Sequence, residues 1–151
     1  MTHSAVIAPA VVLLHLCIHF ALVGINQREL QLIASVAVLG VVVDQLLFRS
    51  GVFIVLGQTA WPPLWMTCLW PVLATTLMHA FRSFQHRPLF SSVLGAVSGA
   101  ASYTAGTRLT DVAFFSEFWG PVILGALWAA LFPLLLLLAA RLERETDAAY
   151  S

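Results

Sequence analysis

Five long apolar stretches, separated by short polar junctions, constrain this chain more than any other feature. Each is close to the length of about 20 residues that a helix needs to cross a bilayer. They cover residues 4–24, 30–48, 63–84, 89–109 and 118–142. The strands of a membrane barrel alternate apolar and polar residues over only about 10 residues, so these continuous runs exclude one. The sequence therefore predicts an all-α, polytopic transmembrane bundle of five spans, in a single domain over residues 1–151.

The chain carries too little charge for a water-soluble globule. Charged residues make up 9% of the sequence and apolar residues 60%, whereas a soluble domain has about 25% charged residues. This composition argues against a soluble enzyme, a nucleic-acid-binding protein and a disordered protein. No basic run is present that would bind nucleic acid. We therefore expect membrane lipids as partners, with a membrane protein or a second copy of the chain as further possibilities, and no nucleic acid.

The arginines predict an orientation. The positive-inside rule places the richer set of junctions in the cytoplasm. The two sets are Arg28, Arg82, Arg87, Arg141 and Arg144 on one side, and Arg49 and Arg108 on the other. The carboxyl terminus is then cytoplasmic and the amino terminus lies outside. An external amino terminus without a leader implies either a short tail that crosses unaided or a preceding helix that is missing from this chain.

The fourth stretch is rich in small residues. From residue 91 to residue 106, eleven of sixteen residues are Gly, Ala or Ser. Two series repeat every four residues: Ser91, Gly95 and Gly99, and Ser98, Ser102 and Gly106. Small residues at this spacing let helices approach closely in lipid. We expect this helix to be the centre of the bundle, and the alternative function of its small face is a ligand groove.

Two other segments carry specific expectations. Residues 52–57 follow the second span and precede a Pro-Pro pair, so they are interpreted as a short interfacial helix or a re-entrant piece. The unbroken leucines at 134–138 are expected to face lipid.

Asp44 is the one acid well inside a predicted span. A charged side chain at the centre of a span costs about 2.5 kcal/mol or more on insertion scales. Asp44 must therefore be protonated, paired or close to water. One interpretation is a carboxyl that exchanges protons, binds a cation or anchors a ligand hydroxyl, and the other is a neutral or capped group that holds helices together. Tyr103, among the small residues of the fourth stretch, needs a hydrogen-bond partner, and Asp44 or a histidine is a candidate.

His15 and His19 are four residues apart and share one helix face. Two histidines at this spacing can bind zinc or iron. A complete shell would need Asp44, His79 or Cys17 from elsewhere in the bundle. The alternative is that both histidines form hydrogen bonds between helices.

His79 and Arg82 lie near the end of the third stretch, with His86 next along the same stripe. This stripe is interpreted either as a binding site for an anionic group, such as a lipid phosphate or a fatty carboxylate, or as side chains that anchor the helix at the interface. No phosphate-binding, dinucleotide-binding, nucleophile-elbow or haem-attachment motif is present in the sequence, so no cofactor is expected.

The residues together resemble an uncharacterised family of small bacterial inner-membrane proteins. The resemblance lies in Asp44, the motif PLWMTCLW over residues 63–70, TLMHAFR over residues 76–82 and YTAGTRL over residues 103–109, and it covers most of the chain. Met78 departs from the family pattern, which usually has Asn beside the histidine. The resemblance implies a bacterial inner (plasma) membrane and a six-span bundle from which this chain lacks the first helix. It also implies an association with fatty-acid modification, because relatives are often found beside such genes.

These observations lead to three functional hypotheses. The first is an accessory or lipid-binding component of fatty-acid or lipid modification or of a stress response. Its site would be lined by Asp44, His79, Arg82 and Tyr103. The second is a small transporter with Asp44 as its proton-linked carboxyl. The third is an intramembrane enzyme that uses His79 and Asp44 as acid and base, with metal at His15 and His19, so the sequence leaves open whether the protein is an enzyme.

Overall fold

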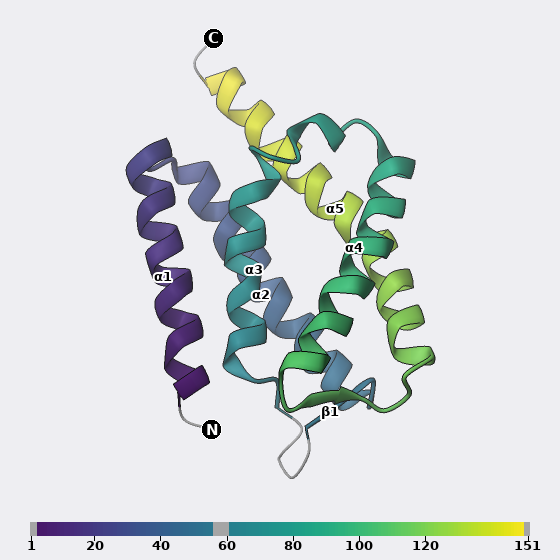
Figure 1. Cartoon of the computed structure of the whole chain (residues 1–151). Coiled ribbons are helices and arrows are strands. Elements are labelled where there is room, and N and C mark those ends of the chain that lie inside the picture. The colour runs from purple at the N-terminus through teal and green to yellow at the C-terminus, as the bar shows by residue number, and fades with distance from the viewer. Residues whose placement is uncertain (1–2, 56–60, 150–151) are drawn as a thin grey trace.

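The computed structural model describes residues 3–55 and 61–149, and five α-helices dominate this part of the chain (Figure 1). A 3-10 turn, η1 (Arg82–Phe84), and two short strands, β1 (Phe53–Val55) and β2 (Val112–Phe114), join them. The helices are α1 (His3–Val23), α2 (Gln27–Arg49), α3 (Leu64–Leu77), α4 (Pro88–Leu109) and α5 (Trp119–Ala149). The prediction of an all-helical bundle is confirmed at this level.

Successive helices run in opposite directions, and α5 ends at the opposite end of the bundle from the start of α1 (Figure 1). Short turns produce the reversals. Gly24 ends α1 with a φ of +89°, a conformation that a residue with a Cβ rarely adopts, and Asn26 caps α2 by accepting a hydrogen bond from the backbone N–H of Arg28. The arginine-rich junctions therefore share one end of the bundle, and Arg49 and Arg108 lie at the other.

Five membrane spans are not confirmed. Within the described residues, two segments are long and apolar enough to cross a membrane by length and composition alone, Gln27–Arg49 and Trp119–Arg144. The apolar parts of α1 and α3 are shorter, at Pro9–Val23 and Leu64–Leu77. The helix α4 is long enough to cross a membrane, but its many small residues contribute little hydropathy. It is therefore not among the two segments that are apolar enough.

The third helix is shorter than predicted, because it ends at Leu77 rather than near residue 84. Beyond it the backbone makes successive tight turns, in which Arg82 N–H donates to His79 O and Phe84 N–H donates to Phe81 O. Gln85 stabilises this ending, since its side-chain amide donates to the carbonyl of Leu77 at 3.4 Å. The apolar residues in this region hide the helix end in the sequence.

Residues 53–55 form a strand and not the short interfacial helix that was one interpretation of this segment. β1 pairs antiparallel with β2, so that Phe53 lies opposite Phe114. Phe53 is almost fully buried and its ring stacks on that of Phe114, with 5.1 Å between centroids. This pairing ties the end of α2 to the connection between α4 and α5. Residues 56 and 57 of the predicted segment lie outside the described residues.

The small residues of α4 allow it to pack closely on α5, as their spacing predicted. Ser91, Gly95 and Gly99 are the buried residues of α4. A Cβ on Gly95 would lie 2.5 Å from the carbonyl oxygen of Trp128, and one on Gly99 would overlap the Trp128 indole. The absence of side chains at these glycines therefore lets the two helices meet.

The leucine run of α5 does not face outward as a whole. Leu135 and Leu136 are buried in the core, whereas Leu134 and Leu137 are exposed. A helix turns about 100° per residue, so an unbroken run of five must occupy both its inner and its outer face. The expectation that residues 134–138 face lipid together is therefore wrong.

Candidate functional site

Asp44 is the polar centre of the bundle, fully buried on α2. Its Oδ2 accepts hydrogen bonds from the indole Nε1 of Trp70 at 3.1 Å and from the hydroxyl of Thr67 at 3.4 Å. Its Oδ1 accepts one from the hydroxyl of Tyr103 at 3.2 Å. The expected contact between Asp44 and Tyr103 is present. These bonds satisfy a buried carboxyl and connect α2 to both α3 and α4.

Trp70 reaches Asp44 because α2 has a glycine where the indole crosses it. A Cβ on Gly40 would overlap the Trp70 ring. On its other side Trp70 stacks on Trp128 of α5, with 5.3 Å between ring centroids and 18° between planes. Trp70 and Tyr103 line a cavity, and Asp44, which does not line it, holds both side chains in place through hydrogen bonds.

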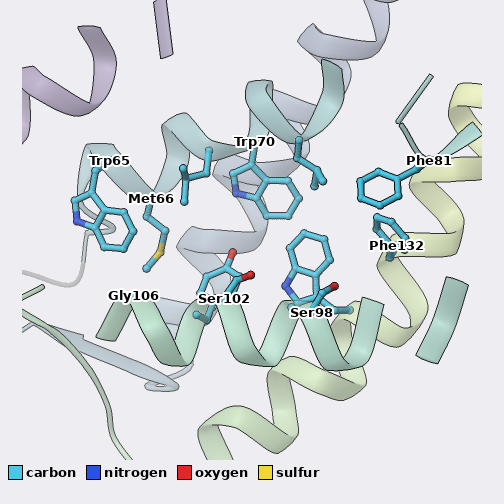
Figure 2. A pocket seen from close by; sticks show the side chains of 13 residues that line it. Trp65, Met66, Trp70, Phe81, Ser98, Ser102, Gly106 and Phe132 are labelled. Atoms are coloured by element: carbon cyan, nitrogen blue, oxygen red, sulfur yellow. The ribbon is translucent and has the colours of Figure 1, made fainter. Parts of the chain in front are cut away.

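This cavity, of about 310 Å³, lies between α3 and α4, with α5 contributing to its wall (Figure 2). Figure 2 shows Trp65 and Trp70 on one helix opposite Ser98, Ser102 and Gly106 on another. The predicted ligand groove along the small-residue face of α4 thus coincides with a cavity. Most of its lining is apolar and aromatic: Trp65, Met66, Leu69, Trp70, Leu73, Phe81, Ser98, Gly99, Ser102, Tyr103, Gly106, Trp128 and Phe132.

Trp128, which helps to line the cavity, carries an unsatisfied donor. Among the buried side chains that the structure describes, its indole Nε1–H is the polar group without a hydrogen-bond partner. The side chain is only 8% exposed. An unpaired buried donor costs about 1–3 kcal/mol, and a ligand oxygen would remove that cost. The sequence did not predict an unpaired donor at Trp128, because the indole's lack of a partner depends on the packing around it.

His79 and Arg82 do not lie with Asp44 in one site. His79 Nε2 is 2.9 Å from Glu29 Oε1, at the end of the bundle where α1 meets α2. Arg82 is largely exposed, and its Nε lies 3.8 Å from Glu143 Oε2. The four predicted ligand-binding residues therefore separate, with Asp44 and Tyr103 at the cavity and His79 and Arg82 at this end. Glu29 and Asp44 are 15 residues apart on α2, which is about 22 Å along its axis at 1.5 Å per residue, so a group that contacts Glu29 lies far from Asp44.

His15 and His19 face the same way but bind different partners. Their rings stack with centroids 6.3 Å apart. His15 Nε2 lies 3.1 Å from the hydroxyl of Thr75, whereas His19 Nε2 lies 2.7 Å from Glu29 Oε1. The interpretation of hydrogen bonds between helices fits both histidines, because Thr75 lies on α3 and Glu29 on α2. Sequence reasoning missed Glu29, which reads as a polar junction residue at the start of α2.

His19, Glu29 and His79 form a second polar cluster, and a cavity of about 210 Å³ adjoins it. Its lining is more polar than that of the first cavity. It consists of Val23, Asn26, Glu29, Met78, His79, Arg82 and Glu143.

Comparison with known proteins places the chain in a family without assigning an activity. No curated protein and no solved structure matches it. A family model described as "Protein of unknown function (DUF2878)" matches residues 2–134, which is most of the chain. The chain belongs to this family of proteins of unknown function.

Proposed function

We propose that this protein is a membrane-embedded helical bundle that binds a lipid-like molecule with a hydrocarbon chain and an oxygen acceptor. The observation that carries the proposal is the apolar cavity between α3 and α4, which is lined in part by Trp128, a residue whose buried indole N–H has no partner. Hydrocarbon suits the aromatic lining, and a carboxyl or ester oxygen suits the donor.

The outer surface supports a lipid environment. Large apolar side chains are exposed on the outside of several helices, including Leu14 on α1, Val38 on α2, Val97 on α4 and Leu134 on α5. Soluble monomers rarely expose contiguous apolar patches of more than a few hundred Å². A hydrocarbon surrounding removes the cost of this exposure.

The ends of the helices support the same environment. The arginines lie in the junctions and helix ends, where polar headgroups and water are available. With the positive-inside rule, we infer that the end carrying Arg82 and the end of α5 faces the cytoplasm of a bacterial cell. Membrane fractionation tests this part: we expect the chain in the pellet after an alkaline wash. Recovery as a folded, detergent-free soluble protein would contradict it.

The cavity supports lipid binding through its shape and position. Ligand pockets range from about 300 to 1,000 Å³, and this cavity lies at the small end of that range. Its volume therefore suits a segment of one acyl chain better than a whole phospholipid. Leu69 and Ser102 belong to its lining and are exposed at the surface, so the cavity opens sideways between α3 and α4. A lipid in the surrounding bilayer would enter through this side. A role as an accessory component of lipid modification follows if the protein presents such a chain to an enzyme.

Photolabelling in proteoliposomes tests lipid binding directly. The probe is palmitic acid with a diazirine in its chain, and labelled peptides are identified by mass spectrometry. We expect labels on α3 and α4 peptides that line the cavity, with competition by unlabelled palmitate. Ser102→Phe fills the cavity and should reduce this labelling several-fold. Ala101→Phe adds the same ring at a neighbouring exposed residue that does not line the cavity, and should leave labelling unchanged.

The Trp128 donor has its own test. Trp128→Phe keeps an aromatic ring and removes the N–H. One hydrogen bond is worth about 0.5–1.5 kcal/mol, so binding of the fatty-acid probe should fall by about 2–10-fold. An alkyl diazirine without the carboxyl should label both proteins equally. Labels spread evenly over all outward-facing residues, unaffected by Ser102→Phe, would refute the proposal.

A further inference from the structure

Three groups that commonly bind metal ions meet at one end of the bundle, away from the cavity between α3 and α4. His19 comes from the last turns of α1, Glu29 from the first turn of α2, and His79 from the turn after α3. The Nε2 atoms of His19 and His79 approach the same oxygen, Glu29 Oε1, at 2.7 and 2.9 Å. One ligand atom from each residue lies within 4.8 Å of the other two. We propose that these residues bind a divalent metal ion of the zinc class.

The donor set suits such an ion. Two imidazole nitrogens and one carboxylate oxygen form the protein ligands of many catalytic zinc sites, and the same set holds iron in other enzymes. Tetrahedral zinc, with bonds of about 2.0–2.1 Å, keeps its ligand atoms roughly 3.3 Å apart. Two of the three spacings here are somewhat shorter, at 2.7 and 2.9 Å, and the third is no more than 4.8 Å. Side-chain adjustments of about an ångström would therefore place all three around one ion.

Burial of the carboxylate supports a cation at this place. The Glu29 side chain is 3% exposed, and that of His19 is 10% exposed. A buried carboxylate is costly unless a cation or several donors compensate it. A neutral imidazole donates one proton, from one nitrogen only, whereas a metal ion binds the unprotonated nitrogens of both histidines together with the carboxylate. With the imidazole protons on Nδ1, both Nε2 lone pairs and the Glu29 oxygen face one small region, where a single ion can bind all three.

The site has an open side. The His79 side chain is 46% exposed, and the cavity of about 210 Å³ reaches both His79 and Glu29. A metal held here would keep a fourth position open toward this cavity, as catalytic rather than structural zinc sites do. Arg82 and Asn26 lie on the same cavity wall. Glu143 lines the cavity too and is paired with Arg82, so a ligand oxygen that binds the metal would meet an ion pair rather than a free guanidinium.

Zinc binding to the purified protein tests the site, with zinc alone as the probe. We expect one zinc per chain by elemental analysis after exposure and washing, and X-ray absorption showing nitrogen and oxygen ligands that include imidazole. This measurement needs no variant. Absence of stoichiometric zinc, or a shell dominated by sulfur from Cys17 or Cys68, would overturn the proposal.

Matched variants locate the site. Loss of a mere outer-shell partner lowers metal affinity by about 10–100-fold, so His79→Asn should lower zinc affinity by at least as much. His79 is half exposed, so this variant should fold. His15→Asn is the control, because His15 stacks on His19 but bonds to Thr75. If His15→Asn and His79→Asn weaken zinc binding equally, or neither does, the assignment is wrong.

Discussion

Replacing Gly95 by Ala tests whether close approach of α4 and α5 stabilises this bundle. An added Cβ would lie 2.5 Å from the Trp128 carbonyl oxygen, 2.6 Å from the Phe132 Cβ and 3.2 Å from the Trp128 carbonyl carbon. These are backbone atoms and a Cβ, so no change of rotamer relieves the overlap. Gly125→Ala, on α5, is the matched control. Its Cβ would meet Ala96 O at 3.6 Å and Ala100 Cβ at 3.9 Å, which is ordinary contact in the same interface.

The comparison isolates the overlap. Both substitutions gain about 0.5–1 kcal/mol from the better helix propensity of Ala. Only Gly95→Ala adds the cost of overpacking, about 1–3 kcal/mol. The two variants should therefore differ by about 1–3 kcal/mol, with Gly125→Ala the more stable. At about 2–4 °C per kcal/mol for a chain of this size, the Tm values should be several degrees apart.

Thermal unfolding in detergent micelles, followed by intrinsic tryptophan fluorescence, measures this difference. Trp128, one of five tryptophans in the chain, lies in the interface itself and contributes to the signal. Equal Tm values for the two variants, or a lower Tm for Gly125→Ala, would refute the reasoning that these glycines permit the α4–α5 contact.

Two further predictions concern the centre of the bundle. Asp44→Leu should destabilise the protein by several kcal/mol, because the donors of Trp70, Thr67 and Tyr103 lose their acceptor, at about 1–3 kcal/mol for each buried donor. Tyr103→Phe removes one hydrogen bond and should cost only about 0.5–1.5 kcal/mol; chemical unfolding in mixed micelles compares the two variants, and equal losses of stability would contradict the hydrogen-bond assignment. Gly40→Ala should displace the Trp70 indole and lower the Tm, with a blue or red shift in tryptophan emission, and an unchanged spectrum and Tm would show that the indole does not cross α2 at this glycine.

The sequence predicted the helices well because their evidence is local. Long apolar runs and breakers such as Gly24 mark four of the five helices to within a few residues at most ends. The end of α3 was missed because Met78, Phe81 and Phe84 continue the apolar run while the backbone already turns. The extension of α5 beyond residue 142 was also missed, since a helix can continue in water after its apolar part ends. The strand pair joins residues about sixty apart in the sequence, and three-residue strands leave no recognisable pattern.

The sites depended on contacts that no spacing reveals. The pairing of Asp44 with Tyr103 was predictable, because each buried polar group needs a partner. The meeting of Glu29 with His19 and His79 requires the exact crossing of three chain segments. The predicted grouping of His79 with Asp44 overlooked the length of α3, since His79 follows Trp70, the partner of Asp44, by nine residues, or about 13 Å along a helix. The small-residue stripe with Ser98 and Ser102 did indicate one wall of the cavity, while the opposite aromatic wall emerged only from the fold.

The strand pair has a consequence for how the cavity keeps its width. In the described part of the chain α3 and α4 barely approach each other, although they flank the same space. β1 and β2 tie the neighbouring backbone together at one end of these helices, and the turns around η1 do so at the other. These two connections set the distance between α3 and α4. Side chains that line the cavity can therefore be exchanged to bind a different ligand without changing the spacing of the helices.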